Sequence, residues 1–430
     1  MSQPETIADE PPLPVDEPES RPGGLPLYVW VILAVVLAIP VGLFWGEGAT
    51  RLNLLATLII RALGALAAPL VVLAILYAIV TNDIRGRQGA RMMAYYLVNT
   101  LVAMGIGLLL SNLIQPGQGA ELIDLKGPRA ELAKKTASDL LLELVPRSVG
   151  EAFAQNNLAQ LVLLTLALGV GLAKIRNEQR ARGERTYETA VALLSVGFEL
   201  LMRVLLWVVA LVPFAVFGVV ASSVGQKEGL HVFQSLIWLI VVVVGGLCGQ
   251  VVWYLTVMAV FARMSPVRFL RGASDVMAST FSTASTAATI PITLRALTGK
   301  LGVSRESSQL AACIGTNFNN DGTALYQATA VLYLAQASGY HLGPVDQLII
   351  VLTTLVASVG AGGIPSGSFV TLPLIFAAVG LPPNKIPVLL TVDWFLDRCR
   401  TTSNVLGDMT VAVLLDRTAV AAPQADIGSE

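Results

Sequence analysis

Apolar segments long enough to cross a bilayer recur along the whole 430-residue chain. A transmembrane helix needs about 20 predominantly apolar residues. Segments of this kind lie at about 27–45, 52–80, 92–114, 190–222, 232–261, 310–335 and 388–415, with a broken apolar region at about 139–173. Only 13% of the residues are charged, whereas soluble domains carry about 25%. The pattern therefore predicts an all-α polytopic membrane protein surrounded by a lipid bilayer.

Two further apolar regions lie at about 273–294 and 348–378. In each of them, the loops before and after the region have the same charge character. The first lies between basic loops, and the second lies between loops almost free of Lys and Arg. Their centres, Ser282–Pro291 and Ala357–Ser368, are rich in small and hydroxyl residues. Glycine permits an unwound tip, and non-helical backbone at membrane depth is tolerated where it is buried or lines a cavity. We therefore predict two re-entrant helical hairpins, with kinked transmembrane helices as the alternative.

Basic residues cluster in the connections at 85–91, 174–185 and 263–271, while those near 224–231 and 338–347 carry almost none. The positive-inside rule therefore places these basic clusters and both chain ends in the cytoplasm, with the protein in the cell inner or plasma membrane. A basic loop at 126–135 departs from this rule.

The last predicted span carries charges in its middle. The polar residues at i, i+4, i+7, i+11 and i+15 are Asp393, Asp397, Arg400, Asn404 and Asp408. At about 100° per residue they share one helix face about 80° wide. A charge at the centre of a bilayer helix costs about 2.5–3.5 kcal/mol on insertion scales, so this face indicates a functional site. Structural ion pairs between helices, or a soluble amphipathic helix, are the alternatives.

The span at 310–335 also contains an intramembrane acid. Asn319, Asn320 and Asp321 offer hard oxygen ligands, which suit Na⁺ or a similar hard cation. Gly322, in mid-span, predicts local unwinding of the helix.

Other chemistry finds little support in the sequence. The three cysteines form no CxxC pair, so neither a disulfide framework nor a zinc site is indicated. The two histidines lie in predicted loops, which argues against histidine-based catalysis. A net charge of −1 argues against a nucleic-acid partner.

Three motifs in the C-terminal third resemble the glutamate transporter family, the dicarboxylate/amino acid:cation symporters. Asn319–Tyr326 resembles the family's run NMDGTALY, Ala361–Gly367 resembles the tip of its second hairpin, and Asp393–Asp408 resembles its last helix. That last helix is most similar to the animal excitatory amino acid transporter branch. Thr283–Pro291 is a looser match to the first hairpin. The resemblance extends from the first span to about Arg417.

The resemblance implies a secondary active transporter, not an enzyme, that assembles as a homotrimer. Each protomer would have eight transmembrane helices and two re-entrant hairpins, with a transport domain that moves as an elevator against a static scaffold. The implied division is a disordered cytoplasmic tail at 1–25, scaffold at 26–89, transport domain at 90–116, scaffold at 117–223, transport domain at 224–420 and a cytoplasmic tail at 421–430.

The resemblance also implies how an acidic amino acid, aspartate or glutamate, would be held. Arg400 would bind the side-chain carboxylate, Asp397 the α-ammonium group and Asn404 the α-carboxylate, with Asp393 as support. A planar guanidinium suits a carboxylate because it can donate two parallel hydrogen bonds. The full implied set is Ser285, Thr286, Thr323, Gly363, Asp397, Arg400, Thr401 and Asn404.

Three cation sites are implied in the same way, for Na⁺ with H⁺ as the alternative. The first would use Asp408 with the carbonyls of Gly315, Asn319 and Asn404. The second would lie between the seventh span and the hairpin carbonyls of Ser358, Val359 and Ala361. The third would use Tyr96, Asn99, Thr100, Asn319 and Asp321.

The chain departs from the family at several positions. Asn320 stands where the family has Met, and Asn317 stands where Thr is usual; both border implied cation sites. Ala284 stands where some prokaryotic members carry Arg. Arg398, on the far side of the last helix from Arg400, resembles the animal branch's placement of that charge.

Two functions of other classes are alternatives to transport. An intramembrane aspartyl protease needs a GxGD motif, and Val405–Asp408 lacks its first Gly. An anion channel would be expected to show a repeated pore ring, and the sequence has none. Within transport, the main alternative is an H⁺-coupled symporter of dicarboxylates such as succinate. Asp321, Asp408 and Tyr96 favour Na⁺, and Asp397 favours a substrate with an ammonium group.

Overall fold

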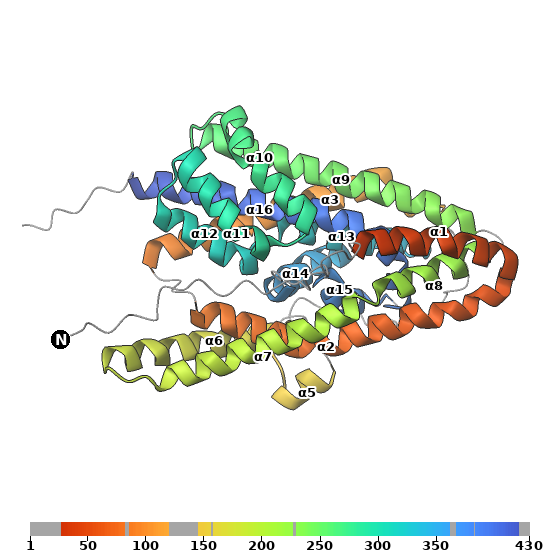
Figure 1. Ribbon diagram of the computed structural model, residues 1–430, viewed down its shortest axis with the longest axis horizontal. Helices are drawn as coiled ribbons and strands as arrows, with labels where there is room; N and C mark the ends of the chain where they lie inside the picture. Colours follow the sequence, from red (N-terminus) through yellow and green to blue (C-terminus); the bar gives the residue numbers. More distant parts are fainter. Residues whose placement is uncertain are drawn as a thin grey trace, which may run out of the picture.

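The computed structural model describes residues 27–81, 86–119, 145–155, 158–226, 229–361, 367–381 and 383–420. All secondary-structure elements in these ranges are helices. Figure 1 shows an elongated bundle in which most helices run along the long axis. Both predicted tails, the basic loop at 126–135 and Gly363 lie outside the described residues.

The elements follow one another in the order that the apolar pattern predicts. The first half contains α1 (Leu27–Trp45), η2 (Gly46–Leu52), α2 (Asn53–Thr81), α3 (Gly86–Ile114), α5 (Val149–Ala154), α6 (Leu158–Ala181), α7 (Thr186–Val209), α8 (Val212–Val224) and α9 (Gly229–Val260). The second half contains α10 (Pro266–Thr283), α11 (Thr286–Arg295), η3 (Ala296–Leu301), α12 (Arg305–Phe318), α13 (Asp321–Ala337), α14 (Pro344–Ala361), α15 (Gly367–Ala378), η4 (Pro383–Leu389) and α16 (Leu390–Val420).

Several helical stretches are long and apolar enough to cross a membrane. In the described part of the chain these are Leu27–Thr81, Gln88–Ile114, Gln160–Ala181, Thr186–Val224 and Gln234–Val260. The first of them contains both α1 and α2, and Figure 1 shows the chain reversing between the two at η2. Large apolar side chains such as Phe44 and Trp207 are exposed on the outside of these helices, as expected for a surface that faces lipid.

The fifth predicted span, at about 190–222, is interrupted near its middle. α7 ends at Val209 and α8 begins at Val212, with Pro213 in the first turn of α8. Proline lacks an N–H group, so it fits best in the first turn of a helix, where that group would have no partner within the helix. The predicted span is confirmed as one long apolar stretch, Thr186–Val224, with an interruption next to Pro213 that the sequence analysis did not predict.

The seventh predicted span is also broken, as expected, but not at the expected residue. α12 ends at Phe318 and α13 begins at Asp321, and Asn319 between them has an extended backbone conformation. Gly322 lies inside α13. The break exposes the backbone polar groups of two helix ends in the middle of the bundle.

The helices pack in two groups. One group contains α1, α2, α6, α7 and α8, and the other contains α3, α9, α10, α12, α13 and α16. In Figure 1, α2, α6 and α7 lie along the lower edge, while α9 and α10 lie along the upper edge. α14 contacts α2 and α6 from the first group and α12 and α13 from the second. The α14–α15 pair therefore lies between the groups.

Both predicted hairpins have packed arms. α10 and α11 contact each other and are joined by Ala284 and Ser285, and Ala284 has the left-handed backbone (φ 54°) that commonly ends a helix. α14 and α15 also contact each other, and their connection at 362–366 lies outside the described residues.

Candidate functional site

The polar face of α16 is turned into the protein. α16 packs against α3, α9, α10, α12 and α13, and this environment covers the charged positions. Arg400 is fully buried, and Asp393, Asn404 and Asp408 are each at most 5% exposed. The predicted face about 80° wide is therefore confirmed as an interior surface, and its charges need partners there because an unpaired buried charge is costly.

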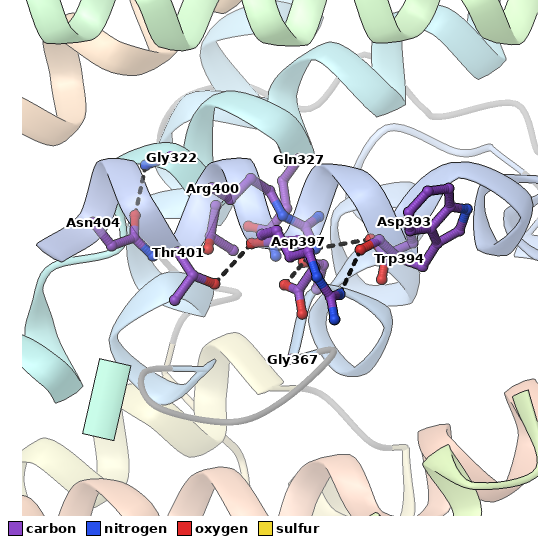
Figure 2. A network of polar contacts seen from close by, with 12 residues as sticks. Gly322, Gln327, Gly367, Asp393, Trp394, Asp397, Arg400, Thr401 and Asn404 are labelled. Atoms are coloured by element: carbon purple, nitrogen blue, oxygen red, sulfur yellow. Dashed lines mark hydrogen bonds and ion pairs between the residues drawn. The ribbon is translucent and has the colours of Figure 1, made fainter. Parts of the chain in front are cut away.

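Arg400 is paired with two acids on its own helix. Its Nη2 donates to Asp393 Oδ1 at 2.8 Å and to Asp397 Oδ1 at 2.7 Å, and Figure 2 shows both carboxylates turned toward the guanidinium group. The Asp393 side chain is 7% exposed and that of Asp397 is 21% exposed. Asp393 therefore lies behind the arginine, and Asp397 forms the accessible edge of the group.

The rest of the guanidinium group faces an aromatic ring and has hydrogens to donate. Its Cζ atom lies 4.0 Å from the centre of the Tyr326 ring, which attracts a cation through the negative face of the ring. Within the described residues, Nε and Nη1 of Arg400 are buried without a hydrogen-bond partner. Sequence reasoning missed Tyr326 as a contact, although this tyrosine closes the Asn319–Tyr326 motif.

The N-terminus of α13 meets α16 at Asn404. Gly322 N donates to Asn404 Oδ1 at 2.8 Å, and Asn404 Nδ2 donates to Thr323 Oγ1 at 3.3 Å; Figure 2 shows the first of these contacts beside the Arg400 group. A Cβ atom at position 322 would lie 2.7 Å from the carbonyl oxygen of Arg400. Glycine is therefore required at 322 for close approach of the helices, and not for unwinding. Thr401, in the same stretch of α16, donates to the carbonyl of Asp397 at 2.7 Å.

Both arms of the first hairpin, α10 and α11, contact α16. Ser285 is the N-cap of α11, and its Oγ accepts from Ala288 N at 3.2 Å. Thr286 Oγ1 is buried without a partner among the described residues. Phe281, just before the tip, contacts Phe395 of α16 edge to face at 6.4 Å.

A second polar cluster lies one turn further along α16. Asn319 Nδ2 donates to Asp408 Oδ1 at 2.8 Å and to the carbonyl of Asn404 at 2.7 Å. A Cβ atom at Gly315 would lie 2.0 Å from Asp408 Oδ1 and 2.6 Å from the Tyr96 hydroxyl, so the carboxylate and the phenol converge on this glycine. The remaining amide oxygen, Asn319 Oδ1, is buried and has no partner among the described residues.

Asp321 forms a third cluster with α3 and α9. Thr100 Oγ1 lies 2.6 Å from Asp321 Oδ1, and Tyr254 donates to Asp321 Oδ2 at 2.6 Å. Asn99 turns toward α9, where its Oδ1 accepts from Trp253 Nε1 at 3.0 Å. The candidate cation residues of α3, α12, α13 and α16 are thus brought together, and sequence reasoning missed the contribution of α9.

The second hairpin contacts the helix break between α12 and α13 through Asn320, which stands where the family has Met. Asn320 Nδ2 donates to the carbonyl of Ser358 at 2.8 Å, and both residues are buried. Val359 and Ala361 belong to the last turn of α14, where backbone carbonyls have no partner within the helix. One carbonyl of the implied second cation site therefore already accepts a hydrogen bond from the protein.

Comparison with known proteins identifies the family. The sequence pattern of the sodium:dicarboxylate symporter family matches residues 27–418. The chain belongs to this family. It is 32% identical to the C4-dicarboxylate transport protein of Anaeromyxobacter sp. (strain K) over 402 residues, which cover 91% of this chain and 89% of that protein.

Relatives named for other substrates are also similar to this chain. Excitatory amino acid transporter 1 of Ambystoma tigrinum is 27% identical over 84% of this chain and 76% of its own length. Neutral amino acid transporter B(0) of Bos taurus is 29% identical over 90% of this chain and 79% of its own length. The protein is therefore a multi-pass membrane protein of a family of cation-coupled dicarboxylate and amino acid symporters.

Proposed function

We propose that this protein is a secondary active transporter that carries an acidic amino acid, aspartate or glutamate, together with Na⁺. The observation that carries the proposal is the buried group in which Arg400 is paired with Asp393 and Asp397 and keeps two nitrogens without a partner among the described residues. Such a group offers both a guanidinium and a carboxylate to a ligand.

The two kinds of charge suit the two ends of an amino acid. Arg400 would bind the side-chain carboxylate of the substrate, and Asp397, the more exposed of its two partners, would bind the α-ammonium group. Asn404 would hold the α-carboxylate. To do so, it would give up one of its hydrogen bonds to α13. The remaining proposed contacts are Ser285 and Thr286 on the first hairpin, Thr323 on α13, Gly363 on the second hairpin and Thr401 on α16.

Charge also favours an amino acid over a dicarboxylate. With both acids ionised, Asp393, Asp397 and Arg400 together carry an excess of one negative charge. Succinate would add two negative charges and no positive one, whereas the ammonium group of aspartate provides a positive charge for Asp397. The C4-dicarboxylate transport protein among the relatives supports the dicarboxylate alternative, so the substrate must be measured.

For cations, the candidate ligands are carboxylate, carbonyl, amide and hydroxyl oxygens, and these suit Na⁺. We assign one site to Asp408 with carbonyls of Gly315, Asn319 and Asn404, and another to Asp321 with Tyr96, Asn99, Thr100 and Asn319. The buried Asn319 Oδ1, which has no partner among the described residues, supports the second assignment. Carbonyls of Ser358, Val359 and Ala361 would form the remaining site. H⁺ coupling through the same acids is the alternative.

The proposed mechanism is an elevator in a homotrimer, with eight transmembrane helices, two re-entrant hairpins and cytoplasmic chain ends. The division of the bundle into two packed groups supports it. The group with α1, α2, α6, α7 and α8 would be the static scaffold, and the group with α3, α9, α12, α13 and α16 would move with both hairpins.

Uptake into proteoliposomes tests the substrate assignment. With an inward Na⁺ gradient, we expect radiolabelled aspartate or glutamate to accumulate, and unlabelled succinate to compete at least about tenfold more weakly because it lacks the ammonium group. Equal or better competition by succinate would instead assign the protein to dicarboxylates.

The hydrogen bond from Asn320 to Ser358 leads to a separate prediction. In the Asn320→Met variant the buried Ser358 carbonyl loses its donor, which should lower the free energy of unfolding by about 1–3 kcal/mol in choline chloride. Na⁺ should restore much of this loss, because a cation can then bind the released carbonyl. Thermal unfolding in choline and in Na⁺ measures both effects.

The matched control is Asn112→Met, because Asn112 makes its hydrogen bonds with Gln347 at an exposed position. That variant should respond to Na⁺ as the wild type does. A loss of stability in Asn320→Met that is equal in both salts would show that the released carbonyl binds no cation.

A further inference from the structure

α9 presents three side chains to the candidate cation cluster. Gln250 Nε2 donates to the carbonyl of Asn99 at 3.1 Å, and Trp253 Nε1 donates to the side-chain oxygen of the same residue at 3.0 Å. Tyr254 donates to Asp321 Oδ2 at 2.6 Å. The spacing of i, i+3 and i+4 places all three on one face of the helix, so α9 forms a wall of the cluster.

We propose that Tyr254 is a positioning residue that fixes the Asp321 carboxylate, so that Oδ2 stays with the phenol and only Oδ1 is presented to the cation. The proposal deepens the proposed Na⁺ coupling and rests on it. Tyr254 and Asp321 are both fully buried, so bulk water cannot replace this hydrogen bond if it is removed.

The other oxygen of Asp321 has a partner that can turn away. The Thr100 hydroxyl lies 2.6 Å from Asp321 Oδ1 and 2.9 Å from the carbonyl oxygen of Tyr96. A hydroxyl has one hydrogen to donate and can rotate it to either acceptor. When the hydrogen points to Tyr96, the Thr100 oxygen and Asp321 Oδ1 can both face a cation.

Gly407 of α16 encloses the fixed side of the carboxylate. A Cβ atom at this position would lie 2.8 Å from the Tyr254 hydroxyl, 3.2 Å from Asp321 Oδ2 and 2.6 Å from Asn319 Nδ2. The phenol, the carboxylate and the amide therefore meet against a glycine that leaves room for all three. The Asp321 cluster and the Asp408 cluster are joined here, through Asn319.

The proposed cation site therefore has one ligand in a fixed orientation, the Asp321 carboxylate, and one that can rotate, the Thr100 hydroxyl. Cation selectivity depends on the size, the ligand number and the flexibility of the cavity. Without the Tyr254 hydroxyl, the carboxylate is free to rotate and to offer one or both oxygens. Na⁺ binding should weaken, and the preference for Na⁺ over the smaller Li⁺ should decrease.

The experiment measures Na⁺ and Li⁺ binding to the purified full-length protein without an organic substrate. The midpoint of thermal unfolding is followed as NaCl or LiCl replaces choline chloride, since a ligand that binds the folded state stabilises it by mass action. For Tyr254→Phe we expect the Na⁺ concentration that gives half of the stabilisation to rise at least about tenfold, the effect of losing one hydrogen bond to a charged group. The ratio of Na⁺ to Li⁺ affinity should decrease as well.

Tyr333→Phe is the matched control. Tyr333 is also buried and also joins α9 to α13, through a 2.7 Å hydrogen bond with Ser235, but it lies about three helical turns from Asp321. It should keep wild-type Na⁺ and Li⁺ midpoints even if its stability falls. Gly407→Ala is a second test variant, and its added Cβ should weaken Na⁺ binding by displacing the same groups.

The outcomes distinguish a failure of the proposed Na⁺ coupling from a failure of the proposed role of Tyr254. A wild-type protein that Na⁺ does not stabilise would overturn the proposed cation coupling. A normal wild-type response with unchanged Na⁺ and Li⁺ midpoints in Tyr254→Phe would overturn the positioning role alone.

Discussion

Substitution of Arg400 by cysteine is expected to abolish aspartate uptake. The guanidinium group is the positive charge that Asp393 and Asp397 share and the proposed partner of the substrate carboxylate. Removing one partner of a buried ion pair costs about 3–5 kcal/mol because the remaining charges are left unpaired. Uptake should therefore be measured together with thermal unfolding and oligomeric state, so that lost binding is separated from lost folding.

Lysine at this position separates the two effects more sharply. Arg400→Lys keeps the charge for Asp393 and Asp397 but loses the planar donor group, and we expect the apparent affinity for aspartate to fall by about 100-fold. Arg398→Lys is the control on the same helix, where the native guanidinium lies 5.0 Å from the Tyr28 ring and donates to the Trp394 carbonyl. That variant should stay within about twofold of the wild type. Wild-type uptake by Arg400→Cys would refute the substrate assignment.

Substitution of Asp408 by asparagine is expected to remove most of the Na⁺ dependence. The carboxylate is buried, accepts from Asn319 at 2.8 Å and lies against Gly315 beside the Tyr96 hydroxyl. A neutral amide of the same shape keeps the packing but loses the charge for a cation. The Na⁺ concentration for half-maximal uptake should rise by about 100-fold, consistent with the loss of a charge-assisted contact.

Asp416→Asn is the control for that substitution. Asp416 lies on the same helix two turns further on, and its carboxylate accepts from Ser304 N at an exposed position. Its removal should leave the Na⁺ dependence unchanged. If Asp408→Asn also kept the wild-type Na⁺ dependence, the assignment of Asp408 to a cation site would be wrong.

In the last helix, the helical period predicts which charged residues share a face, but not which of them form ion pairs. The spacing of Asp393, Arg400 and Asp408 was sufficient to place them on one face, and their burial follows from the cost of charge in a bilayer. The pairing within that face depends on rotamers and on neighbouring helices. Asp393 was expected only to support the site, yet its distance to the guanidinium matches that of Asp397 within 0.1 Å.

Helix breaks were harder to predict than helices. Pro213 marks the start of α8, but the apolar run continues across it, and hydrophobic periodicity alone gives one helix. Unwinding in the seventh span was expected at Gly322, whereas the break is at Asn319 and Asn320. Gly322 is instead needed for close packing, because the backbone of α16 approaches it too closely for any side chain.

Partners far apart in the sequence could not be found from the sequence alone. Tyr254 lies in an apolar helix 67 residues before Asp321, and nothing in the local pattern of α9 indicates an acid nearby. A polar side chain within such a helix does indicate a buried contact, because each buried polar group needs a hydrogen-bond partner. Identifying that partner requires the packing of α9 against α13 and α16.

The most direct test of cation-coupled amino acid transport is uptake of labelled aspartate into proteoliposomes under one imposed gradient at a time. With an inward Na⁺ gradient and no proton gradient, we expect aspartate to accumulate above the external concentration. An inward proton gradient without Na⁺ should give none. Accumulation driven by protons in the absence of Na⁺ would contradict Na⁺-coupled amino acid transport, as would uptake of succinate with none of aspartate.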